Sequence, residues 1–299
     1  MMTAIARATE IEEILDGAVD LHVHPGPSPF PRRISLLEAA VDAADAGFRA
    51  IVVKSHHHSM VTDVLAVEAA VGGLPLPVFS GIPLNSCTGG LNPATVDLTL
   101  AMGGRAVWFP TISAEKHACL HEELNFPDPA IPLRQPDLIA VLDDSGKLRP
   151  EAIEILELIR DNNAILMTGH SDVAVIDALI AGARQVGVER IVVNHPNFVV
   201  GANVETCREW ARQGVTMEHS LCMYDVKSHL FQAEIPTLLA YLDACGPSQT
   251  ILGSDLGQAG NPTPVESYRD ILMILLEQGV PADVLHQIVA VNGQRLLGV

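Results

Sequence analysis

Residues able to bind a metal ion recur at the ends of short apolar runs in this sequence. His22 and His24 end the first run, His170 and His195 end the fifth and sixth, and Asp255 ends the eighth. One such histidine would usually be an ordinary structural residue. Several imidazoles and a carboxylate buried together would each cost roughly 1–3 kcal/mol if left unpaired, whereas a divalent ion uses them as a normal N/O ligand set. The pattern therefore predicts a metal centre.

Strand geometry predicts where these side chains point. Successive side chains of an extended chain face opposite sides, so His22 and His24 share one face and Val23 points to the other. Asp20 is then expected on the face of the histidines, one pleat deeper. From there its carboxylate could hold a ligand imidazole in the right tautomer.

A second polar cluster, Lys54-Ser55-His56-His57-His58, ends the second run. Alternation places Lys54 and His56 on one face and His57 on the other, so the three histidines cannot all bind one ion. At most His56, or else His57, contributes to a metal or substrate site. Lys54 could be a carboxylated ligand that bridges two ions, or an ammonium that binds a substrate carboxylate. We prefer the ammonium, and a solvated or ion-paired lysine is the ordinary alternative.

The seventh run adds one further candidate for binding a metal or substrate. Glu218 and His219 are neighbours, so only one of them can face the site. We expect it to be His219, because Met217 then fills the interior layer beneath it.

The elements that must position these residues follow a regular alternation. Eight apolar runs cover residues 18–24, 48–56, 76–84, 105–112, 163–170, 189–196, 214–220 and 249–255. Helical patterns lie between them, for example at 36–46, 150–160, 173–186 and 204–213, with Pro150 at a start, Ser171 or Asp172 as a cap and Gly47, Gly187 and Gly214 at ends. This alternation indicates βαβ units. Eight units close into a (β/α)8 barrel, an α/β fold with its active site at the C-terminal ends of the strands. We expect one barrel domain over residues 1–299.

An open, doubly wound sheet is the alternative architecture. It would ordinarily carry a Gly-rich phosphate loop after its first strand, and the segment 22–30, HVHPGPSPF, is not such a loop. The barrel is therefore preferred.

One segment, residues 113–147, interrupts the alternation after the fourth run. It is Pro-rich and irregular, and residues 138–148 read as a small hairpin turning at Asp-Ser-Gly. Loops of this length are usually functional or disordered, so we expect a lid or substrate-pocket insert over the barrel mouth. A surface excursion or an oligomer contact is the alternative. Its charged residues His117, His121, Glu122 and Glu123 are expected to be solvated.

Composition limits the classes of function. Hydrophobic residues make up 48% of the 299 residues, and the net charge is −18 with no basic run, which argues against a nucleic-acid partner. Five well-separated cysteines suit reduced thiols better than a disulfide framework. No signal peptide or membrane span is recognisable, so a cytoplasmic enzyme with a small-molecule substrate is expected. The oligomeric state is open, and a homo-oligomer is compatible with the sequence.

On these residues the sequence resembles the amidohydrolase superfamily of metal-dependent hydrolases. That pattern has HxH after strand one, a Lys or Glu bridge usually after strand four, histidines after strands five and six, and Asp after strand eight. His22, His24, His170, His195 and Asp255 match it in order, and the ending VNGQRLLGV is similar to the Asn-x-x-Arg-Leu-Leu-Gly of the superfamily. The bridge departs from the pattern, because no Lys or acidic residue ends the fourth run and Glu115 lies beyond it. The number of metal ions is therefore open.

The resemblance implies a TIM-barrel hydrolase with one or two divalent ions, zinc by default. Such an ion lowers the pKa of bound water to about 7. The resemblance gives Asp255 the role of proton acceptor and donor, with the metal or His195 polarising the carbonyl of an amide, lactone or ester. Metal-dependent decarboxylation or hydration, and phosphoester hydrolysis, are the rival activities. A non-catalytic metal-binding barrel is the alternative from another class.

Overall fold

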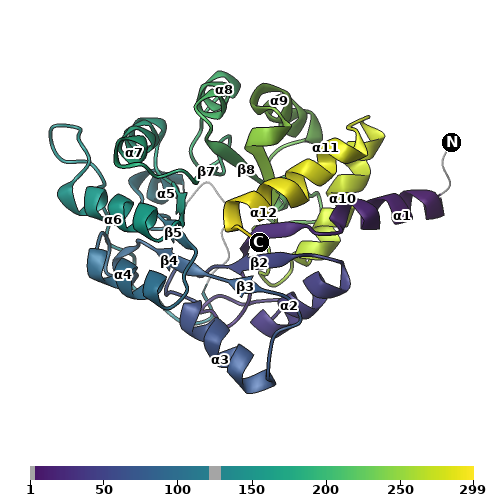
Figure 1. Cartoon of the computed structure of the whole chain (residues 1–299), viewed down its shortest axis with the longest axis horizontal. Coiled ribbons are helices and arrows are strands. Elements are labelled where there is room, and N and C mark those ends of the chain that lie inside the picture. The colour runs from purple at the N-terminus through teal and green to yellow at the C-terminus, as the bar shows by residue number, and fades with distance from the viewer. Residues whose placement is uncertain (1–3, 121–128) are drawn as a thin grey trace.

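The structure, a computed structural model, describes residues 4–120 and 129–299. Short parallel strands lie at the centre and helices surround them (Figure 1). The expected eight runs all form strands: β1 Val19–Val23, β2 Ala50–Val53, β3 Val78–Phe79, β4 Gly81–Pro83, β5 Ala106–Trp108, β6 Ile165–Met167, β7 Ile191–Asn194, β8 Thr216–Ser220 and β9 Thr250–Gly253. The third run gives two of them, because Ser80 interrupts it.

Pairing follows the order of the chain around a barrel. β1, β2 and β3 form one parallel set, and β4 to β9 form another. Ser80 connects the sets, since its carbonyl accepts from Arg105 N at 2.8 Å and its hydroxyl donates to Val53 O at 2.7 Å. The other junction lies between β1 and the residues after β9, where His24 N donates to Leu256 O and Asp255 N donates to His22 O, both at 2.7 Å. These contacts give the (β/α)8 barrel predicted from the sequence.

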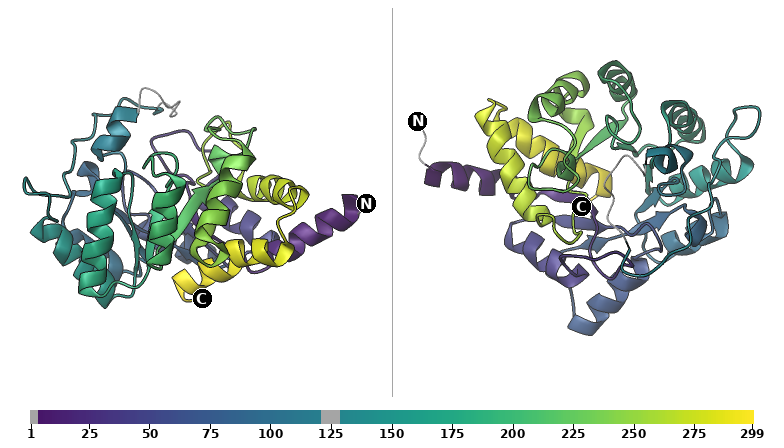
Figure 2. Two further views of the ribbon diagram at one scale, coloured as in Figure 1. Left: turned by 90° about the horizontal axis from the view of Figure 1, so that it is seen from above. Right: turned by 180° about the vertical axis from the view of Figure 1, so that it is seen from behind.

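The helices are α1 Ala4–Leu15, α2 Leu36–Asp45, α3 Val61–Val71, α4 Pro93–Ala101, α5 Glu115–Leu120, α6 Pro150–Asp161, α7 Val173–Val186, α8 Val204–Arg212, α9 Ile235–Cys245, α10 Pro264–Glu277, α11 Ala282–His286 and α12 Asn292–Leu297. The N-terminal α1 lies outside the ring beside α10 and α11 (Figure 2). No helix of residues 4–120 and 129–299 has the length and apolar character needed to cross a membrane.

Local signals set the helix boundaries as expected. Pro150 is the first residue of α6, Asp172 accepts from Val175 N at the start of α7, and Gly187 ends α7 in the left-handed conformation. Of the two proposed caps for α7, Asp172 and not Ser171 is therefore the one used. Proline has no N–H to leave unpaired at a helix start, the Asp172 side chain accepts a hydrogen bond from a free N–H, and a left-handed glycine allows the last carbonyl groups to be paired.

The core is divided by the barrel wall. Inside it, residues from successive strands form one apolar cluster: Val19, Leu21, Ala50, Val52, Ala106, Trp108, Ile165, Met167, Val192 and Ile251. The other side chains of these strands pack against the surrounding helices. The polar strand ends lie beyond the inner cluster, so the apolar layers form a floor beneath them.

The insert after β5 contains both predicted and unpredicted structure. Leu142 and Leu148 form an antiparallel bridge, and Asp143 N donates to Lys147 O at 2.7 Å, as the expected hairpin requires. The short helix α5 at its start was not predicted. His121, Glu122 and Glu123 lie outside the described residues.

Candidate metal centre

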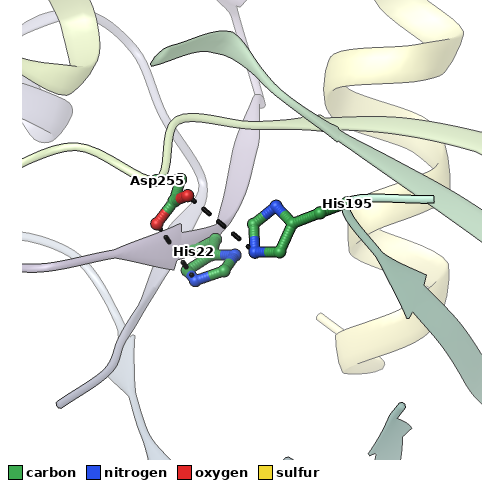
Figure 3. A group of neighbouring side chains, drawn as sticks. All are labelled: His22, His195 and Asp255. Atoms are coloured by element: carbon green, nitrogen blue, oxygen red, sulfur yellow. Dashed lines mark ion pairs between the residues drawn. The ribbon is translucent and has the colours of Figure 1, made fainter. Parts of the chain in front are cut away.

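Three of the predicted ligands converge at the carboxyl ends of β1, β7 and β9. His22, His195 and Asp255 each offer a ligand atom, and these atoms lie within 4.8 Å of one another (Figure 3). His22 Nε2 is 3.4 Å from Asp255 Oδ1, and His195 Nε2 is 3.9 Å from Asp255 Oδ2. His24 joins them, with its Nε2 3.1 Å from Asp255 Oδ1. The Asp255 carboxylate therefore faces three imidazoles.

Two of these residues have an unusual backbone. His195 and Asp255 have φ angles of 49° and 54°, in the left-handed region that non-glycine residues rarely adopt. Such conformations cost about 1–3 kcal/mol each and are typical of functional sites. At both positions the strand has just ended, and the two side chains face each other, with His195 Nε2 3.9 Å from Asp255 Oδ2.

The outer nitrogens of His22 and His24 have fixed partners. His24 Nδ1 lies 2.8 Å from Lys54 O, and a carbonyl oxygen can only accept, so this Nδ1 carries a proton. His22 Nδ1 lies 2.5 Å from Glu218 Oε1, and Asn194 Nδ2 donates to the other Glu218 oxygen at 2.7 Å. Both imidazoles are thereby oriented with Nε2 toward Asp255, as ligand histidines are.

This arrangement fits a cation better than it fits a hydrogen-bond network. A neutral His24 with its proton on Nδ1 has a lone pair on Nε2, and that lone pair faces a carboxylate oxygen at 3.1 Å. Two acceptors at this distance repel each other unless a positive charge lies between them. His170 Nε2 is also buried, with no hydrogen-bond partner in the described part of the chain. Neutral imidazoles and a carboxylate are the donor set of zinc and related divalent ions.

Burial favours the neutral forms of the His24 and His195 imidazoles. It lowers the pKa of His24 to about 3 and that of His195 to about 4, in both cases against the opposing effect of Asp255. The pKa of Asp255 is held well below its ordinary value of 3.8, because the surrounding histidines outweigh the effect of burial. The carboxylate is thus the charged group of the cluster at neutral pH.

A second group of histidines adjoins the first. The ring of His170 lies 5.0 Å from that of His195, and His56 lies between His24 at 4.9 Å and His170 at 5.8 Å. His56 Nδ1 is 2.8 Å from Thr111 Oγ1, which Asn85 also contacts. All five predicted ligands therefore lie in one region, with His56 beside them.

Lys54 lies among the ligands. Its Nζ is 3.1 Å from His22 Nε2 and 5.5 Å from the centre of the Trp108 ring, and its side chain is buried. Burial lowers the pKa of Lys54 to about 8, although Asp255 and Glu218 oppose this shift. The residue shares the inner face with His56, in agreement with strand alternation.

The expectation for Asp20 was wrong. The register between β1 and β2 shifts between Asp20 and Val23, and this irregularity breaks the alternation on which the expectation rested. Asp20 instead faces a small cavity lined by residues of α2 and α10, and its Oδ1 accepts from His22 N at 2.9 Å and Ser254 N at 3.0 Å. It positions the backbone of the site and contacts no ligand imidazole.

The choice between Glu218 and His219 was also wrong. Glu218 faces the interior and contacts His22, whereas the His219 ring lies 5.6 Å from that of Tyr241 on α9. Met217 packs in the outer layer among residues of α8 and α9, so the side chains next to it along the strand face inward. Gly253 on the neighbouring strand was the sequence signal that could have identified Glu218 as the inward-facing residue. A Cβ at Gly253 of β9 would lie 3.0 Å from Glu218 Oε1, so this glycine leaves room for the carboxylate.

The interpretation of His117 as a solvated loop residue was wrong as well. His117 is only 4% exposed, and its Nδ1 lies 2.8 Å from His170 Nδ1. The nearby Glu115 is exposed at the start of α5, and no Lys or acidic side chain ends β5. The strand end that usually carries the Lys or Glu bridging two metal ions therefore carries neither residue in this chain, as the sequence indicated.

Comparison with known proteins agrees with this geometry at the level of fold. Over 98% of its length the chain is similar to an amidohydrolase from Pseudomonas aeruginosa, with a TM-score of 0.64, 11% identity and 99% coverage of that chain. It is similar over 94% to a putative 2-pyrone-4,6-dicarboxylic acid hydrolase from Pseudomonas putida, with a TM-score of 0.57, 17% identity and 97% coverage. A 2,6-dihydroxybenzoate decarboxylase from Rhizobium matches over 95%, with a TM-score of 0.53, 11% identity and 99% coverage. The resemblance to amidohydrolases is therefore confirmed for the fold.

Comparison of the sequence with protein families gives a more specific result than comparison of the fold. A family described as "Family of unknown function (DUF6282)" matches residues 17–218, and the chain belongs to it. No curated protein matches the sequence.

Proposed function

We propose that this protein is a metal-dependent hydrolase that cleaves an amide, lactone or ester bond of a small anionic metabolite. The observation that carries the proposal is the contact between His24 and Asp255. Lys54 O fixes the proton of His24 on Nδ1, and the Nε2 lone pair then faces a carboxylate at 3.1 Å. A cation among His22, His24, His195 and Asp255 would satisfy these groups, with His170 as a ligand of the same ion or an adjoining one.

The chemistry follows from what each residue can do. A divalent ion, zinc by default, would supply Lewis acidity and lower the pKa of a coordinated water to about 7. The Asp255 side chain is 12% exposed whereas His22 is fully buried, so Asp255 is the acidic group that the reacting water can reach. Asp255 accepts the proton of that water and returns it to the leaving group. The ion, or a neighbour such as His195, would polarise the substrate carbonyl, and the 2.8 Å contact between His195 Nδ1 and Ser220 Oγ orients that imidazole.

The test is metal analysis followed by a substrate panel. Purified protein is expected to contain about one or two equivalents of a divalent metal, as the ligand number allows. Metal-reconstituted protein would then be assayed on lactones, amides and esters with and without a carboxylate group. Aromatic carboxylates belong in the panel, because the fold is also that of a decarboxylase. Metal binding without turnover of any class would favour a non-catalytic barrel.

A cation near the site supports an anionic substrate. Arg32, in the loop after β1, has a buried Nε with no hydrogen-bond partner among the described residues. Burial lowers the pKa of Arg32 to about 10, with Asp255 as the opposing charge, so the guanidinium remains charged near the site at neutral pH. Its loop is held against the segment after β9, where Arg33 N donates to Gly257 O at 2.8 Å. We propose that Arg32 binds the carboxylate of the substrate.

Replacing Arg32 by Met should therefore raise KM for carboxylate-bearing substrates by about tenfold or more, because a charged hydrogen bond contributes roughly 1.5–3 kcal/mol. The kcat should change much less, since a uniform binding contact is lost. Arg33→Met is the matched control, because Arg33 pairs with the exposed Glu266. Equal KM values for the Arg32 variant and wild type would exclude this contact.

Lys54 has two alternative roles, and its location limits both. An ammonium 3.1 Å from His22 Nε2 would repel a divalent ion held by that atom. Lys54 must therefore lose its charge, as a carboxylated ligand does, or turn toward the substrate carboxylate. We prefer the second role, in which the Lys54 ammonium binds the substrate carboxylate.

Lys54→Ala separates the two roles. If Lys54 binds the substrate, the variant keeps the metal-to-protein ratio of wild type and loses affinity for anionic substrates. A clear fall in the ratio would assign Lys54 to the metal and overturn our preference. Elemental analysis of both proteins, purified side by side, is the measurement.

We further propose that residues 1–299 work as one catalytic domain and that the insert 113–147 forms part of the substrate pocket. The contact between α5 and the histidine cluster supports this role for the start of the insert.

A further inference from the structure

His117, on α5, contacts the histidine cluster through His170. Its Nδ1 lies 2.8 Å from His170 Nδ1, and the two rings stack at 4.9 Å with an angle of 21° between their planes. A hydrogen bond between two imidazole nitrogens contains a single proton. One Nδ1 therefore donates and the other accepts.

The direction of this hydrogen bond follows from the other nitrogen of His170. His170 Nε2 is buried and has no hydrogen-bond partner within residues 4–120 and 129–299. If His170 Nδ1 accepted, a neutral His170 would carry its proton on Nε2, and burying that proton unpaired costs about 1–3 kcal/mol. If His170 Nδ1 donates to His117, Nε2 carries a lone pair that a metal ion can use. The second arrangement leaves no polar group of His170 unused.

The backbone that carries α5 is firmly held. Asn85 Oδ1 accepts from Thr111 N at 2.9 Å and from Ser113 N at 3.1 Å, which fixes the chain just before the helix. Ala114, next in the chain, is 3% exposed. These contacts fix the turn that leads into α5 and so place His117 beside His170.

We infer that His117 is a positioning residue, which accepts the Nδ1 proton of His170 and so orients His170 Nε2 as a metal ligand. The inference rests on the proposed metal centre and extends it to the insert. His117 is not among the ligand residues predicted at strand ends, because it belongs to the insert after β5. A metal-ligating histidine commonly donates its second N–H to a carboxylate or carbonyl, and here an imidazole from the insert takes that place.

The experiment compares His117→Phe with His117→Asn in the full-length protein. Phe keeps a stacked ring without a nitrogen, whereas Asn can place an oxygen near the former Nδ1. Titration of each chelator-treated protein with Co2+, followed by its visible absorption, gives the affinity without any substrate. His117→Phe should bind Co2+ about 10–100-fold more weakly than wild type, the usual effect of losing the partner of a ligand histidine. His117→Asn should recover most of that loss, and Cys119→Ser on the exposed face of α5 should match wild type.

Each result decides the question. A His117→Phe affinity within threefold of wild type would overturn the inference and leave the proposed metal centre intact. If wild type itself binds no Co2+, the proposed function fails and the inference fails with it. Thermal unfolding with chelator shows whether the variants fold. Should His117→Phe not fold, His117→Asn is compared with His117→Ala, where tenfold tighter binding by Asn supports the inference and equal binding contradicts it.

Discussion

Replacing Asp255 by Asn is expected to lower turnover by about 10²–10⁴-fold, the usual contribution of a general acid–base. The amide has the shape of the carboxylate but cannot accept the proton of the attacking water. It also removes the negative charge that three imidazoles face at 3.1–3.9 Å. Because the backbone contacts of Asp255 remain, including the 2.7 Å hydrogen bond from its N–H to His22 O, the fold should be preserved.

The measurement is kcat on whichever substrate the panel identifies, together with circular dichroism and thermal unfolding. Asp177→Asn is the matched control, since Asp177 accepts a hydrogen bond from Trp210 Nε1 on the outside of the barrel at 2.7 Å. That variant should keep its activity. Turnover close to wild type in Asp255→Asn would remove Asp255 from the reaction.

Removal of the metal should destabilise the protein markedly. A ligand that binds only the folded state stabilises it by about 4 kcal/mol when its free concentration is 1,000 times its dissociation constant. Without the ion, the lone pair of His24 Nε2 faces Asp255 with nothing between them. The midpoint of thermal unfolding should therefore fall in excess chelator and recover when zinc is added back.

Variants identify the site responsible for this stabilisation. His195→Ala should lose most of the response to chelator, because one ligand is gone. His286→Ala should retain it, since His286 contacts Ile14 O outside the metal centre. An identical midpoint for wild type with chelator and with zinc would contradict a resident metal ion.

Much of this architecture could be predicted from sequence because it depends on local patterns. The eight apolar runs predict the strands, and alternation continued just past β2 groups Lys54 with His56, which lie beside His22 and His24. The same rule failed for Asp20, because one irregularity in β1 changes which side chains face inward. No local signal marks that shift.

The other errors arose from packing between distant segments. Whether Glu218 or His219 faces the interior depends on the register of β8 and on the space that Gly253 leaves on β9. The burial of His117 depends on where α5 docks, and its partner His170 is 53 positions away in the chain. Such contacts follow from the three-dimensional arrangement, which propensity and spacing do not determine.

The junction between β1 and β9 has a consequence for biosynthesis. Asp20, near the start of the barrel, binds Ser254 N across a separation of 234 residues, and His22 contacts Glu218 across 196. A nascent chain emerging from the ribosome therefore carries only part of the ligand set until nearly the whole barrel has been synthesised. If the protein holds the proposed metal ion, metal acquisition would be a late event in its maturation, and intermediates that lack β9 would not retain the ion in its final site.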